Sequence, residues 1–236
     1  MKKSIFLAAV AFVLMSVTAS AQFMQSNGGS NAKASVEDVF NTFDLTYSPV
    51  TMKSSDGNDS ESEELNGLSL NWSQARLLTE QFPVYIQYGA GLQFTWKTES
   101  DSYDDYEEYT VKIKSTTSLL TVKVPVNLLY NFAIPNTAVS VMPYVGLNAQ
   151  IHLLGQSKIK TEYSGDVETS KVNYFSEEDM EEPLNRFVLG WQIGAMLSYN
   201  KYFFGVGYSG PVTNLYKEDE FKINTNQVNI SLGFKF

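Results

Sequence analysis

The sequence predicts an all-β protein, an eight-stranded antiparallel up-and-down β-barrel that crosses a membrane with its strands. Three observations lead to this prediction. Eight segments alternate between apolar and polar residues, and the connections between them alternate between short and long. In addition, 22 of the 26 carboxylates fall in the four long connections. Because successive side chains of a strand point to opposite faces, such segments have one apolar and one polar face.

Residues 1–21 have the three parts of a cleaved signal peptide. Lys2 and Lys3 provide the positive start, and an uncharged apolar run follows from 5 to 15. The small residues at 19–21 form the cleavage site. The apolar run is too short for a spanning helix, which needs about 20 apolar residues. We therefore predict export across the inner membrane.

Two further segments complete the predicted organisation. Residues 22–38 are rich in glycine, serine, asparagine and alanine, which indicates a flexible N-terminal segment. Residues 39–236 form the predicted outer-membrane barrel domain, and their length suits one domain.

Composition excludes several classes of function. The chain has no cysteine, so disulfides, zinc–thiolate sites and a lipoprotein anchor are excluded. The formal net charge of −9 becomes −11 once the two lysines of the signal are removed, and such an acidic chain is a poor nucleic-acid binder. Aromatic residues make up 14% of the chain, as expected where rings gather at the two interfaces of a bilayer.

The eight alternating segments follow one another along the domain. In the first four, the apolar positions are Phe43, Leu45, Tyr47; Leu68, Leu70, Trp72; Val84, Ile86, Tyr88, Ala90, Leu92, Phe94, Trp96; and Leu120, Val122, Val124, Val126, Leu128, Tyr130, Phe132. In the last four they are Val145, Leu147, Ala149, Ile151; Phe187, Leu189, Trp191, Ile193, Ala195, Leu197; Tyr202, Phe204, Val206, Tyr208; and Val228, Ile230, Leu232, Phe234, Phe236. We expect these positions to face lipid.

The opposite, polar face is rich in glycine, at Gly89, Gly91, Gly146, Gly190, Gly194, Gly205, Gly207 and Gly233. Small inward residues suit a narrow barrel, whose interior has little room for side chains. A water-soluble barrel would instead place bulky apolar residues inside. The asymmetry therefore favours a membrane barrel.

The connections predict the orientation. The short ones lie around 76–82, 133–138 and 200–201, and the long acidic ones span 50–65, 98–113, 155–186 and 210–222. Short periplasmic turns and long extracellular loops are typical of outer-membrane barrels. Charges are costly in the hydrocarbon zone, which explains why carboxylates avoid the strands.

The chain resembles the small outer-membrane β-barrels known as porin-family or OmpA/OmpW-like proteins, especially those of Bacteroidetes. The resemblance covers about residues 39 to 236. It is carried by the signal peptide, the segments 123–128 and 143–147, and the terminal Gly-Phe-Lys-Phe. It implies a location in the outer membrane, folding by the barrel assembly machinery, and a role for Phe236 as the C-terminal signal read by that machinery. It brings no catalytic, cofactor or metal residues.

Five ionisable residues fall on the inward face of the predicted barrel: Asp44, Lys97, Lys123, His152 and Lys235. An inward charge in a narrow barrel must be paired or hydrogen-bonded, because burying it alone is costly. One reading is a proton or ion pathway. The favoured reading is a structural network that plugs the lumen and fixes strand register.

His152 is the only histidine, and a lipid-modifying enzyme on such a barrel would need a histidine beside a serine. The position two residues on, which is expected to share its face, is Leu154, and Ser157 and Ser164 lie in the next long connection. We therefore predict a lumen or rim histidine and no catalysis.

The acidic connections suggest calcium binding or a docking surface, but they also fit solvated loops. The run from Asp56 to Glu61 has the hard oxygen ligands that calcium prefers, yet the twelfth position from Asp56 is Gly67 rather than glutamate. Solvated, mutually repelling loops are the favoured reading, with no metal and no cofactor.

The predicted role is structural or in surface interaction. The expected partners are outer-membrane lipid and lipopolysaccharide, with an extracellular partner at the acidic loops as a further candidate. The alternative is a narrow channel or transporter for small hydrophobic molecules, as the OmpW resemblance implies. An accessory barrel of a secretion system is also compatible with these residues.

Overall fold

The computed structural model describes residues 37–55, 59–79, 82–104, 110–163, 166–180, 183–216 and 222–236. The predicted signal peptide, the linker up to residue 36 and parts of the acidic connections lie outside these ranges. The strands are β1 (Val39–Ser55), β2 (Ser60–Leu77), β3 (Val84–Asp104), β4 (Thr110–Tyr130), β5 (Phe132–Ala133), β6 (Val139–Tyr163), β7 (Asp166–Asn173), β8 (Phe187–Tyr199), β9 (Tyr202–Pro211) and β10 (Lys222–Lys235).

Eight of these strands close into a ring of antiparallel pairs. The order is β4-β3-β2-β1-β10-β9-β8-β6, and β6 pairs with β4 to complete the circle. The first strand pairs with the last, as Thr42 opposite Lys235 and Leu45 opposite Leu232 show. β5 and β7 lie outside the ring, and each pairs with β6. The predicted eight-stranded barrel is confirmed.

The alternation predicted from the sequence sets the two faces of every ring strand. In β1, Leu45 and Tyr47 are exposed, whereas Thr46 and Ser48 are buried. The exterior carries exposed leucine, valine, isoleucine and aromatic side chains, and the interior carries buried serine, threonine, asparagine and glutamine. The barrel is therefore apolar outside and polar inside.

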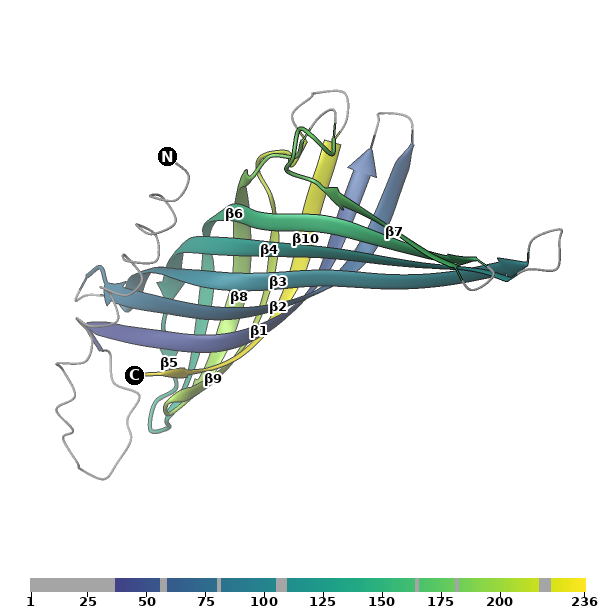
Figure 1. Ribbon diagram of the computed structural model, residues 1–236. Coiled ribbons are helices and arrows are strands. Elements are labelled where there is room, and N and C mark those ends of the chain that lie inside the picture. The colour runs from purple at the N-terminus through teal and green to yellow at the C-terminus, as the bar shows by residue number, and fades with distance from the viewer. Residues whose placement is uncertain are drawn as a thin grey trace.

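One end of the barrel holds the short turns, the start of β1 and the end of β10 (Figure 1). We call it the turn end, and the opposite end the hairpin end. The turns follow β2, β5 and β8. Asn136 and Asn200 take positive φ values of 62° and 54° in two of these turns. Asparagine tolerates this conformation better than most residues with a side chain, and tight turns require it.

The predicted long loops are wrong in detail, because strand continues through much of them. β1 and β2 remain paired up to Ser55 and Ser60, and β3 and β4 up to Asp104 and Thr110. β6 runs to Tyr163 and then pairs with β7. Polar and charged residues occupy most positions of these extensions, and the few apolar ones, such as Val111 and Ile113, do not form the long alternating run that reveals a strand in the sequence. Backbone pairing holds them instead.

The extensions of β3, β4, β6 and β7 form a sheet that projects beyond the ring, which we call the blade. The β1–β2 hairpin and the blade diverge at the hairpin end (Figure 1). Among the described residues, no helix is long and apolar enough to cross a membrane.

Candidate functional site in the barrel lumen

Apolar side chains fill the lumen at the turn end. The cluster consists of Phe40, Ala75, Tyr85, Leu129, Met142, Met196 and Phe203. The rings of Phe40 and Tyr85 meet edge to face, with centroids 5.3 Å apart. Each residue lies near the turn-end limit of its strand on the inward face, so the cluster forms a floor. Lys235 lies beside this floor, with its ammonium 3.4 Å from Glu37 and 5.3 Å from the centre of the Phe40 ring.

A belt of neutral polar side chains runs around the inner wall above the floor. Gln192 donates to Asn127 (2.6 Å), Asn127 donates to Gln87 (2.9 Å), and Gln87 donates to Ser73 (2.8 Å). The hydroxyls of Ser73 and Thr42 then pair at 2.6 Å. The belt joins β8, β4, β3, β2 and β1, so it ties together strands that are not all neighbours. Each amide side chain forms a hydrogen bond with the next one in the belt. These bonds offset the free-energy cost of burying polar groups without partners.

Asp44 is the anionic centre of the lumen. Its carboxylate accepts hydrogen bonds from Thr46 Oγ1 (2.6 Å) and Asn71 Nδ2 (2.7 Å). The Thr46 hydroxyl also pairs with Ser231 at 2.7 Å, which links β1 to β10. Lys123 lies close enough for its positive charge to attract Asp44.

Lys123 reaches across the lumen. Its ammonium donates to Gln227 Oε1 at 2.8 Å. β4 and β10, which carry these two residues, are separated by three strands in the ring. The contact therefore spans the interior rather than following the wall.

His152 and Phe175 cover the lumen at the hairpin end. His152 is 4% exposed, and its Nδ1 pairs with the Thr121 hydroxyl at 2.8 Å. Its ring stacks on Phe175, with an interplanar angle of 11° and centroids 5.8 Å apart. Phe175 also packs against Gly155, where a Cβ would lie 2.5 Å from the ring. Phe175 thus covers one face of the His152 ring and is itself packed against the backbone of β6.

Arg186 holds this cap in place. Its guanidinium donates to the carbonyls of His152 (3.3 Å), Leu153 (3.0 Å) and Phe175 (3.4 Å) and lies 4.8 Å from the centre of the Phe175 ring. The register of β6 against β4 shifts here, since Leu120 faces Leu154 and the next residue faces His152. Leu153 is therefore a bulge residue, and the arginine satisfies carbonyls that the disturbed ladder leaves available.

The bulge corrects one prediction. Leu154 was expected to share the face of His152, but the extra residue reverses the alternation, and Leu154 is 64% exposed on the exterior. Gly155 occupies the inward position instead. A bulge of this kind has no signature in the residue types of this segment.

Lys97 lies at the rim of the hairpin end, where it pairs with Glu99 (2.7 Å) and Glu63 (3.7 Å). Phe236 lies at the turn end, exposed on the exterior, and exchanges two backbone hydrogen bonds with Asn41. The five predicted lumen residues thus do not form one network. Asp44 and Lys123 interact, His152 joins the cap, and Lys97 and Lys235 lie at opposite ends.

Sequence reasoning missed the neutral belt and the cap. Gln87, Asn127 and Gln192 lie on the polar side of their alternating segments, so the alternation predicts their inward position, but neutral residues carry no signal of a network. Phe175 and Arg186 lie in a predicted long loop, where periodicity carries no signal. Within the described ranges, no group of three or more histidine, aspartate or glutamate residues could hold a metal ion.

Comparison with known proteins finds likenesses in structure alone. No family model matches the sequence, and no curated protein sequence matches it. Among solved structures, the chain is similar to Ail, the attachment invasion locus protein of Yersinia pestis (14% identity, 85% of this chain and 100% of that one, TM-score 0.34). It is also similar to Neisserial surface protein A (13%, 82% and 97%, TM-score 0.34) and to the outer membrane enzyme PagL (10%, 80% and 97%, TM-score 0.42).

The fold is established by the closed ring of strand pairs, independently of these likenesses. Eight antiparallel strands, an apolar exterior and a polar interior occur together in this chain. By that combination, the chain has the architecture of the small outer-membrane β-barrels.

Proposed function

We propose that the chain is an integral outer-membrane β-barrel with a structural or surface-interaction role, whose lumen is plugged by its own side chains. The exposed apolar side chains of the exterior support the membrane location, because a water-soluble monomer rarely exposes so continuous an apolar surface. Aromatic pairs lie toward both ends of this surface, Phe94 with Trp96 at one and Tyr130 with Phe132 at the other. Rings at both interfaces are typical of such barrels.

The observation that carries the plugged lumen is the filling of the interior at three levels. The apolar floor occupies the turn end, the belt and the Lys123–Gln227 contact occupy the middle, and Phe175 covers His152 at the hairpin end. An eight-stranded ring leaves an interior just wide enough for side chains. A continuous water path for ions would have to displace all three levels.

The absence of catalysis is part of the same proposal. His152 is buried beneath Phe175, and its Nδ1 partner is the hydroxyl of Thr121. A histidine that activates a nucleophile needs an accessible substrate position beside it. The stacked ring of Phe175 covers one face of the imidazole, and Arg186 holds that ring in place.

Single-channel conductance in planar bilayers tests the plugged lumen. Heat-modifiable migration on a gel first confirms that the barrel is folded. We expect no discrete openings from the wild type. Phe187→Ala changes an exposed exterior ring and is expected to stay silent. Phe175→Ala removes the cap but leaves the floor and the belt in place, so we expect it to stay silent as well. Stable openings of the wild type would replace this proposal with the channel or transporter alternative.

A further inference from the structure

The exterior face of the blade carries a concentration of lysines in an otherwise acidic protein. Lys112 and Lys114 come from β4, Lys158 and Lys160 from β6, and Lys171 from β7, and all five are exposed. They lie on the exterior face of their strands. Within the ring, the same face of β4 and β6 carries the exposed apolar residues. Of the blade carboxylates, Glu99, Asp101, Asp166 and Glu168 lie on the opposite face by strand register, whereas Glu162 and the register position of Asp104, at the end of β3, lie on the lysine face.

Strand register places several of these lysines directly opposite one another. Lys114 faces Lys160 across β4 and β6, and Lys158 faces Lys171 across β6 and β7. Directly opposed side chains have Cβ atoms about 5 Å apart, and like charges in such pairs are destabilising. An anion bound between the pairs would remove this repulsion.

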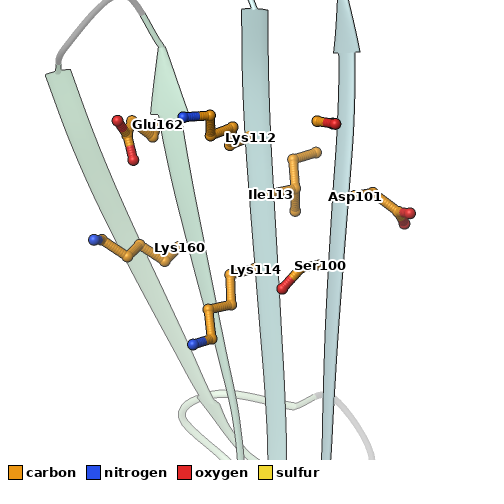
Figure 2. A pocket seen from close by; sticks show the side chains of 8 residues that line it. Ser100, Asp101, Lys112, Ile113, Lys114, Lys160 and Glu162 are labelled. Atoms are coloured by element: carbon orange, nitrogen blue, oxygen red, sulfur yellow. The ribbon is translucent and has the colours of Figure 1, made fainter.

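A pocket of about 350 Å³ lies over this surface (Figure 2). Lys112, Lys114 and Lys160 line it together with Ser100 and Ser102. The three ammonium groups and two hydroxyls can donate hydrogen bonds to the oxygens of a phosphate group.

Two carboxylates also line the pocket, and strand register limits their effect. Asp101 is on the opposite face of β3 from the two serines, by the alternation of the strand. Glu162 stands opposite Lys112 and compensates that lysine. Lys114 and Lys160 remain opposed to each other, so the surface keeps a positive excess.

The distance of the lysines from the apolar zone of the exterior indicates which layer of the membrane they reach. Leu120 and Leu154, directly opposite each other, are the last aliphatic residues on the exterior of β4 and β6 before the lysines. Lys158 is four residues beyond Leu154, and Lys114 six residues beyond Leu120. At about 3.3 Å per residue and a tilt of about 40°, these spacings correspond to roughly 10 and 15 Å along the membrane normal. Lysine side chains extend several ångströms back toward the surface. This range reaches the polar layer of the outer leaflet.

We propose that the exterior face of the blade binds the phosphate groups of the outer-leaflet glycolipid, with Lys114 and Lys160 at its centre. This inference rests on the proposed outer-membrane location. Charge complementarity carries it, since a membrane surface bearing many phosphates matches a flat sheet face bearing five lysines. The surface would hold the blade against the membrane and order the lipid around the barrel.

The test uses the full mature chain folded in micelles, with labelled lipid A carrying its phosphates as the probe. Lys114→Gln with Lys160→Gln removes the central pair, and Arg76→Gln with Lys201→Gln removes the same charge from the exposed surface at the turn end. Each lysine near an anionic lipid surface changes affinity about fivefold, so we expect binding roughly 30-fold weaker for the first variant. The second should bind like the wild type, and high salt should weaken wild-type binding.

Dephosphorylated lipid A and soluble polyphosphate complete the design. We expect the dephosphorylated lipid to bind the wild type as weakly as the pair variant binds lipid A, and polyphosphate to compete poorly. Equal binding by the wild type and the pair variant would overturn the inference, as would indifference to dephosphorylation. Full competition by polyphosphate would assign the surface to a soluble polyanion. Heat-modifiable migration separates the two failures: an unfolded wild type contradicts the outer-membrane proposal, whereas a folded barrel indifferent to phosphate contradicts only this inference.

Discussion

Tyr144 provides a direct test of how tightly the lumen is packed. Its hydroxyl lies against the backbone of two inward glycines, Gly194 on β8 and Gly207 on β9. A Cβ added at Gly207 would overlap the hydroxyl oxygen of Tyr144, whereas its next neighbours, the carbonyl oxygen of Ile193 and Cζ of Tyr144, lie at 3.2 and 3.4 Å. One atom therefore causes most of the clash.

The expected energies follow from this geometry. Gly207→Ala should destabilise the barrel by about 1–3 kcal/mol, which is typical for one extra carbon in a packed interior. In a Tyr144→Phe background the overlapping oxygen is absent, so the same change should be neutral. It could even stabilise by up to about 0.5–1 kcal/mol, because alanine loses less backbone entropy than glycine in a strand.

The four proteins of this cycle are compared by urea unfolding of the lipid-inserted barrel, followed by gel mobility and tryptophan fluorescence. Gly205→Ala is the matched control on the same strand and face, since its Cβ would meet nothing closer than 3.3 Å. We expect a coupling energy of at least about 1 kcal/mol between Gly207 and Tyr144. An equal cost of Gly207→Ala in both backgrounds would refute the packing argument.

Two further predictions concern the exterior and the cap. Leu232 is 65% exposed at the middle of the apolar stretch of β10. Leu232→Arg should lower the free energy of unfolding by about 2–4 kcal/mol, whereas Ser231→Thr on the inward face should leave it almost unchanged. The same unfolding assay measures both. Similar costs at both positions would contradict the lipid-facing assignment. Arg186→Met should leave three carbonyls without their charged donor, and we expect amide hydrogen exchange across residues 152–155 to accelerate about ten- to a hundredfold. Unchanged protection there would show that the bulge is held without the arginine.

The ring itself could be predicted because two different environments select the two faces of each strand. Lipid outside and a narrow interior select a strict alternation of apolar and polar residues, and the exposed Leu45 and Tyr47 of β1 lie on the face that this alternation predicts. Asp44 and Lys123 were recognised as lumen residues because a charge within an alternating segment is conspicuous.

The strand extensions at the hairpin end could not be predicted, because water contacts both faces of a sheet that projects beyond the ring. There few apolar residues alternate with polar ones, so the sequence predicts loops where β3, β4 and β6 continue. The lysines at 112, 114, 158 and 160 form one face only because of strand register. The bulge at Leu153 and the role of Arg186 depend on strand register, which only the folded ring defines. Local sequence patterns do not show which distant segments pair, and the bulge and the lysine face depend on that pairing.

The seam of the barrel joins its first and last strands, and this has a consequence for assembly. β1 pairs with β10, and Asn41 and Phe236 exchange hydrogen bonds at the turn end. Without β10, the remaining sheet would have two open edges of backbone donors and acceptors. In hydrocarbon no water is present to satisfy them, so a partly zipped sheet cannot rest within the bilayer. Insertion and closure are therefore coupled, and the protein should be found either fully inserted or outside the membrane.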